Sequence, residues 1–154
     1  MKIRTSALES IESISNIVEN ESISPLYVFN HEDLESAINN LKDVLLLSRI
    51  EAVLFSGIFI LNSSDNYSQG IIPLSEILNI SRYEALKQFS VVLNLEKRGL
   101  VHIETERSGD YIFKVDRTFF SAIIMNEREV YGVQKKRELN FFDYMQKSYD
   151  LLNH

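Results

Sequence analysis

The chain has no cysteine among its 154 residues. Neither a disulfide framework nor a thiolate metal site can therefore form, which favours a reducing compartment such as the cytoplasm. The most apolar stretch, Ile50–Leu61, is shorter than the roughly 18 residues that a membrane-spanning helix needs, and it contains Glu51. The N-terminus lacks the apolar core of a signal peptide. The sequence therefore predicts no association with a membrane.

Motifs of catalysis and cofactor binding are also missing. His31, His102 and His154 show no metal-ligand spacing, and the glycines are isolated, so no phosphate-binding loop is present. No serine lies in a nucleophile-elbow pattern, and the carboxylates fall on predicted helix surfaces. The sequence thus predicts no catalytic residue, no metal ligand and no cofactor site, and we expect a chain that is not an enzyme.

The apolar residues, 45% of the chain, suffice for one buried core and follow helical spacing at the N-terminal end. One apolar stripe predicts a helix over Ser6–Asn20, and a loop follows around Pro25. Asn30 is the predicted N-cap of a second helix. Its buried stripe is predicted to comprise Leu34, Ala37, Ile38, Leu41 and Leu45.

Ser48 and Glu51 have the spacing of a capping box and predict a helix over Arg49–Leu61. This helix is apolar almost all round, so we expect it to be central and covered on several sides. After a polar loop, Ile71-Ile72 predicts a short strand. A short helix is then predicted over Leu74–Leu78.

A second capping box, at Ser81 and Glu84, predicts a helix over Arg82–Arg98, and Gly99 is its predicted C-terminal cap. Two alternating strands, Leu100–Glu106 and Tyr111–Val115, follow and form a hairpin. The predicted fold class is therefore mainly α with a small β-hairpin wing. Its order of elements is that of a winged helix-turn-helix with extra N- and C-terminal helices.

Beyond the hairpin, Asp116 is expected to cap another helix, and a last amphipathic helix is predicted over Leu139–Leu152. The predicted organisation is an N-terminal helical extension (1–47), a winged-helix core (48–115) and C-terminal helices (116–154). The C-terminal helices would lead into a domain outside this chain.

The helix over Arg82–Arg98 would be the recognition helix of a DNA-binding winged helix. At about 100° per residue, Leu86, Phe89 and Leu93 share one side, which we assign to the core together with Ala85 and Val92. The opposite side is the predicted interaction surface. It comprises Ser81, Glu84, Lys87, Gln88, Val91, Leu95 and Arg98, with Arg107 and Lys114 added by the wing.

Charge on this part of the chain favours a protein partner over DNA. The net charge of the whole chain is −6, and Ser81–Val115 contributes six basic and five acidic side chains. The wing itself is acidic, and phosphate neutralisation supplies most non-specific DNA affinity. Val91 and Leu95 would meet protein on this interpretation. They would equally suit the core if the helix curves or the wing covers them.

From Phe29 onward the chain resembles the winged-helix domain that precedes the ATPase core of a group of bacterial AAA-type ATPases. The resemblance is carried by SRIEAVLFSGIFIL, by PLSEILNISRYEALKQFSVVLNLEKRGLVHI and by the tail LNFFDYMQKSYDLL. It implies an N-terminal domain without its motor. Because the Walker motifs are missing, no nucleotide is expected to bind here.

We therefore expect a non-catalytic winged-helix module that binds a protein partner or an adjoining domain, appended to an AAA-type ATPase. The alternative is a DNA-binding transcription regulator whose terminal helices form a dimer interface. The sequence leaves the oligomeric state open, because the first and last helices each have an apolar stripe that needs a partner.

Overall fold

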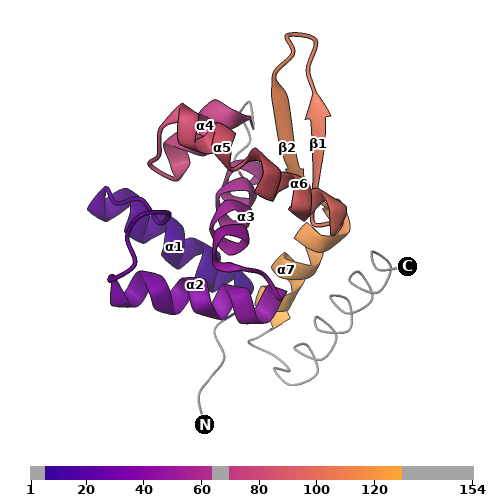
Figure 1. The fold of residues 1–154 in the computed structure, drawn as a ribbon. Helices are drawn as coiled ribbons and strands as arrows, with labels where there is room; N and C mark the ends of the chain where they lie inside the picture. Colours follow the sequence, from indigo (N-terminus) through magenta and orange to yellow (C-terminus); the bar gives the residue numbers. More distant parts are fainter. Residues whose placement is uncertain (1–5, 64–69, 130–154) are drawn as a thin grey trace.

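A computed structural model describes residues 6–63 and 70–129 of the chain. These residues are mainly α-helical with one antiparallel β-hairpin, which confirms the predicted fold class (Figure 1). The elements follow the predicted order except for the short strand at Ile71-Ile72 and the single helix over Arg82–Arg98. The helix predicted over 139–152 lies outside the described residues. The elements are α1 (Ala7–Glu21), α2 (Glu32–Leu45), α3 (Arg49–Asn62), α4 (Ile71–Ile77), α5 (Arg82–Lys87), α6 (Phe89–Lys97), β1 (Val101–Thr105), β2 (Tyr111–Val115) and α7 (Arg117–Glu129).

Helix α3 is the central element, as its apolar circumference predicts. It is buried continuously from Ala52 to Phe59, and α1, α2, α4, α6 and β2 all pack against it. The predicted capping box is present: Ser48 Oγ accepts from the Glu51 amide at 3.2 Å, and Glu51 accepts from the Ser48 amide at 3.0 Å. Gly57 permits the close approach of α4, since a Cβ there would lie 3.0 Å from Leu74 Cδ1.

Helices α1 and α2 form an antiparallel pair beside α3, and the stripes predicted for them are buried. The N-cap of α2 is His31, so the prediction of Asn30 was wrong. His31 Nδ1 accepts a hydrogen bond from the Leu34 amide at 3.1 Å, and its Nε2 lies 2.7 Å from Glu21 Oε2. A neutral imidazole can accept at Nδ1 and donate at Nε2, so one ring caps α2 and bonds the last residue of α1.

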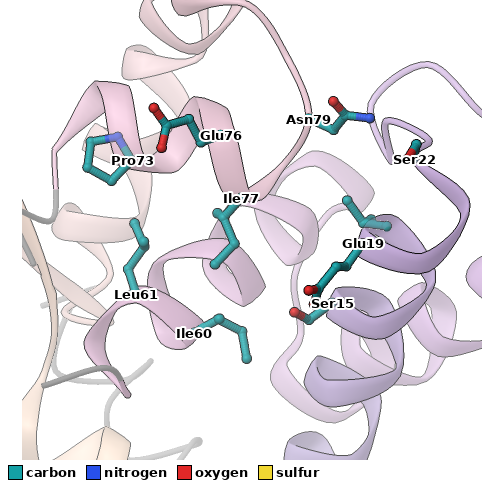
Figure 2. A pocket seen from close by; sticks show the side chains of 10 residues that line it. Ser15, Glu19, Ser22, Ile60, Leu61, Pro73, Glu76, Ile77 and Asn79 are labelled. Atoms are coloured by element: carbon teal, nitrogen blue, oxygen red, sulfur yellow. The ribbon is translucent and has the colours of Figure 1, made fainter. Parts of the chain in front are cut away.

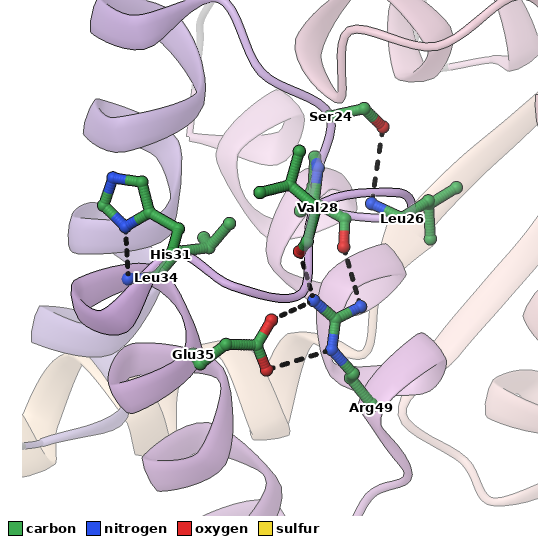
Figure 3. Close-up of polar contacts among 8 residues, drawn as sticks. Ser24, Leu26, Val28, His31, Leu34, Glu35 and Arg49 are labelled. Atoms are coloured by element: carbon green, nitrogen blue, oxygen red, sulfur yellow. Dashed lines mark hydrogen bonds and ion pairs between the residues drawn. The ribbon is translucent and has the colours of Figure 1, made fainter.

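Arg49 fastens the link between α1 and α2 to the start of α3 (Figure 3). Its guanidinium donates to Pro25 O at 2.7 Å and to Val28 O at 3.0 Å, and it forms a two-point ion pair with Glu35 of α2. The ring of Phe29 lies 4.4 Å from the guanidinium carbon. Three consecutive segments are thus held by one half-buried side chain.

The short strand predicted at Ile71-Ile72 is wrong, because both residues lie in the first turn of α4. The free edge of β2 is instead bonded by a side chain. Asn62 at the end of α3 donates to Phe113 O at 3.0 Å and accepts from the Val115 amide at 2.8 Å. This one amide satisfies two of the backbone groups that a third strand would have paired.

The turn from α6 into the hairpin follows the prediction. Gly99 has a φ of 77°, and the amides of Gly99 and Leu100 donate to Glu96 O and Leu95 O in a Schellman motif. Val101 pairs with Val115 at the base of the hairpin.

Helix α7 brings the chain back from the hairpin to the central helix and closes the core. Asp116 caps it by accepting from the Phe119 amide at 3.0 Å. The Phe119 ring packs edge-on against Phe55 of α3, with ring centres 5.6 Å apart.

A single hydrophobic cluster extends from α1 to α7, with the rings of Phe55, Phe59, Phe113 and Phe119 among its largest buried side chains. The predicted divisions at residues 47 and 115 stay predictions. Within the described residues no single helix is long and apolar enough to cross a membrane. Helices α2 and α3 meet that criterion only as a pair, and they are bent by 92° where they join.

Candidate interaction surface on α5 and α6

Helices α5 and α6 together cover the segment that the sequence predicts as one helix. They are separated at Gln88, whose φ of −85° and ψ of 3° interrupt the helix. Ser81 caps α5, its Oγ accepting from the Glu84 amide at 3.1 Å, and this is the only half of the predicted capping box that forms. The Glu84 carboxylate lies 3.6 Å from Lys87 Nζ.

The buried side of α5 and α6 differs from the predicted one. Leu95, predicted to face a partner, is 0% exposed, whereas Leu86 and Leu93, predicted to be core, are 55% and 38% exposed. At about 100° per residue, the buried side is centred roughly a quarter turn from the predicted core side. The cause is tertiary: α6 packs on α3 and β1 through Val92 and Leu95. The apolar sector of the helix is wider than the part that the core covers.

The predicted interaction residues consequently do not form one exposed surface. Ser81 and Lys87 are exposed, whereas Glu84, Gln88, Val91 and Arg98 are half-buried and Leu95 is fully buried. Arg98 forms an ion pair with Glu51 of α3 at 3.6 Å. Val91 and Arg98 line an open hollow of about 640 Å³, to which the end of α2 contributes Leu46 and the start of α3 contributes Ile50.

Glu84 also interacts with the link between α1 and α2. Hydrogen bonding to its carboxylate, followed by desolvation and its negative charge, raises the pKa of the Tyr27 hydroxyl. Tyr27 is 54% exposed, so the contact lies at the surface. Glu84 therefore connects α5 to the N-terminal helices.

The exposed side of the two helices combines apolar and basic residues. We call it the α5–α6 face; its residues are Arg82, Tyr83, Leu86, Lys87, Ser90, Leu93, Asn94 and Lys97. The two acidic residues of these helices are half-buried, and one of them, Glu96, accepts from the Ile103 amide at 2.8 Å. The Lys87 ammonium lies 4.8 Å from the centre of the Tyr83 ring.

Sequence reasoning missed Tyr83, Leu86 and Leu93 as surface residues. The signal that could have found them is the number of apolar side chains. Leu86, Phe89 and Leu93 lie next to Ala85, Val92 and Leu95 around the helix, and a helix that contacts its core on one side does not bury both groups.

The wing contributes little positive charge. Arg107 is exposed in the turn, as predicted, and the exposed Lys114 forms an ion pair with Glu104 at 3.2 Å. Glu106 and Asp110 are exposed at the two ends of the turn. The hairpin thus presents more carboxylates than free cations to a phosphate backbone.

Two histidines have structural partners. His31 caps α2, and His102 on the hairpin lies 2.9 Å from Asp116, the cap of α7. Within residues 6–63 and 70–129, no three His, Cys, Asp or Glu side chains gather where they could hold a metal ion.

Comparison of the chain with protein-family models, curated proteins and solved structures finds no significant match.

Proposed function

We propose that the chain is a non-catalytic winged-helix module, and that its α5–α6 face binds an acidic protein segment with apolar anchor residues. The observation that supports this most is the exposure of Leu86 and Leu93 beside the exposed ring of Tyr83. Tyr83 and Leu86 lie on α5 and Leu93 on α6. Exposed apolar side chains gathered in one part of a surface are typical of protein interfaces.

Charge defines the chemistry of the partner. Arg82, Lys87 and Lys97 flank the apolar residues, and the exposed positions of the two helices include no carboxylate. An acidic partner would be steered to this face, and its apolar side chains would supply the binding energy by leaving water. Tyr83 adds an aromatic side chain with a polar hydroxyl, a type that interfaces favour.

Selection from a random peptide library on the folded protein tests the proposal. We expect enrichment of peptides that combine aspartate or glutamate with large apolar residues. Leu86→Ser should weaken the binding of an enriched peptide at least about tenfold, because a desolvated anchor is lost. Met125→Ser is the matched control: it removes an apolar side chain that is 54% exposed on α7, outside the face. Equal loss in both variants would contradict the proposal.

The alternative function, a DNA-binding regulator, draws support from the same three cations and from Ser90 and Asn94, whose side chains could bond base edges. The exposed leucines and the acidic wing disfavour DNA binding, because neither interacts favourably with phosphate. Titration of the protein with duplex DNA at several salt concentrations separates the two. Binding that falls steeply with salt and is lost on Lys87→Glu would favour DNA and overturn the protein proposal.

We also propose that the module regulates an AAA-type ATPase, in keeping with the three stretches that resemble such domains. Sequencing the reading frame beyond His154 tests this. A Walker A motif downstream would support the assignment, and a stop codon directly after His154 would exclude a motor on the same chain. The absence of cysteine supports the cytoplasm as its location.

A further inference from the structure

A second concave feature lies on another side of the fold, between α1 and α4 (Figure 2). The cleft has a volume of about 530 Å³, and the C-terminal end of α3 forms its floor. We call it the α1–α4 cleft. It is lined by Ser15, Val18, Glu19 and Ser22 from the α1 side, by Ile60 and Leu61 of α3, and by Pro73, Glu76, Ile77 and Asn79 from the α4 side.

The cleft is apolar below and acidic at its rim. Ile60 and Ile77 are half-buried and face the space between the helices, whereas Glu19 on one wall and Glu76 on the other are exposed (Figure 2). Helix α1 contains four glutamates and no lysine or arginine, and α4 contains no basic residue. An occupant that fits this environment has apolar side chains and positive charge.

The α5–α6 face has that composition. It exposes Leu86 on α5 and Leu93 on α6, and the exposed Arg82, Lys87 and Lys97 lie on the same two helices. The two surfaces are complementary in charge, since one has cations and the other carboxylates.

We propose that the α5–α6 face of one copy of this chain docks into the α1–α4 cleft of a second copy. The inference rests on the binding face of the proposed function and identifies the acidic, apolar partner as the chain itself. The contact is heterologous, because the two copies use different surfaces. Repetition of such a contact forms a ring when the rotation closes and a filament when it does not.

Two-fold pairing through either surface is electrostatically unfavourable. Face against face would bring Arg82, Lys87 and Lys97 toward their own copies, and cleft against cleft would oppose Glu19 and Glu76 to themselves. Like charges that meet in an interface are repelled, whereas the head-to-tail arrangement pairs opposite charges. The association should accordingly weaken as salt concentration rises.

Charge reversal on each surface tests the arrangement. In sedimentation velocity at increasing protein concentration, the wild-type protein should self-associate. Glu76→Lys and Lys87→Glu should each weaken this association about tenfold or more, since each removes an attraction and adds a repulsion. A mixture of the two variants should associate again, because Glu76→Lys retains an intact face and Lys87→Glu retains an intact cleft, and because the altered cleft and the altered face also have opposite charges.

Matched variants control for the change in net charge. Glu12→Lys alters an exposed residue of α1 that does not line the cleft, and Arg107→Glu alters an exposed residue of the wing turn. Both should associate like the wild type. Lys97→Glu provides a second reversal on the face, since Lys87→Glu also loses its ion pair with Glu84. Circular dichroism confirms that each variant is folded.

A wild-type protein that stays monomeric, or a mixture of the two variants that does not associate, overturns the inference. Either result leaves the proposed function standing if acidic, apolar peptides still bind the α5–α6 face and lose affinity on Leu86→Ser. Failure of that peptide test, in contrast, does not disturb a measured head-to-tail association. The head-to-tail association and the proposed function can therefore be contradicted independently of each other.

Discussion

Arg49 shows how much of this fold depends on a side chain that no sequence motif singles out. It lies next to the Ser48 cap, so its backbone begins α3, while its side chain reaches back to Pro25 and Val28. The planar guanidinium has five N–H donors in a fixed fork, which lets it bond two carbonyl oxygens and both oxygens of a carboxylate at once. The sequence predicts the helix start here from local spacing, but not these contacts, because their partners are 14 to 24 residues away.

Replacement of Arg49 by lysine should destabilise the fold by about 1–3 kcal/mol, because a single ammonium leaves half-buried carbonyl groups without donors. Chemical denaturation measures the free energy of unfolding. Arg82→Lys, at an exposed position, is the control and should stay within about 0.5 kcal/mol of the wild type. Equal stability of the two variants would show that the Arg49 contacts contribute little.

Tyr27 provides a pH-dependent test of the contact between the N-terminal link and α5. Since the hydrogen bond and charge of Glu84 raise the pKa of Tyr27, Glu84→Ala should lower that pKa toward the ordinary tyrosine value. A raised folded-state pKa means that any stabilisation is complete below the unfolded pKa and is lost as pH rises through the folded one. NMR titration of the tyrosine rings measures the shift. A Tyr27 pKa that does not respond would show that the two side chains do not interact in solution.

Element by element, the sequence predicts most reliably what local chemistry decides. The caps at Ser48, Ser81 and Asp116 form as their spacing predicts, and Gly99 ends α6 with a positive φ. These features succeed because the bonding groups lie within about four residues of one another. The N-cap at His31 was not predicted, because a histidine rarely serves as N-cap.

The orientation of α5 and α6 could not be predicted from the sequence. Apolar side chains cover so wide a sector of this helix that several rotations would bury a similar area. The packing of α3 and β1 against Val92 and Leu95 decides among them, and that packing involves residues far away in the chain. The exposed side of α5 and α6 therefore lies roughly a quarter turn from the side that the sequence predicts to be exposed.

Substitution of two leucines tests whether α5 and α6 have the observed orientation or the predicted one. Leu95→Ala should cost about 2–5 kcal/mol of stability, because it opens a cavity in the core, whereas Leu93→Ala at the surface should change stability by less than about 1 kcal/mol. The free energies of unfolding of both variants, from denaturation curves, decide between the orientations. The reverse ranking would restore the predicted interaction surface.

At the scale of the whole molecule, the distribution of charge divides the chain into two parts, whereas the hydrophobic core is continuous across both. Charge distinguishes an acidic end, with the four glutamates of α1, from the basic α5–α6 face. The core makes no such distinction, because one hydrophobic cluster includes Ile11 of α1, Leu41 of α2, Phe55 of α3 and Ile123 of α7. The acidic helices are therefore part of the structure that supports the basic face.

This continuity predicts that a chain starting at Ser48 does not fold by itself, although the sequence assigns its residues to a separate winged-helix core. Without α1 and α2, side chains of α3 such as Leu54 and Phe55, now 0% exposed, would lose much of their cover, and the remaining apolar burial would not offset the conformational entropy. Circular dichroism and thermal unfolding of residues 48–154 should show no cooperative transition. Addition of a separate peptide of residues 1–47 should restore it, because the two pieces share one core. A cooperative transition of residues 48–154 alone would show instead that the boundary at residue 47 separates independent units.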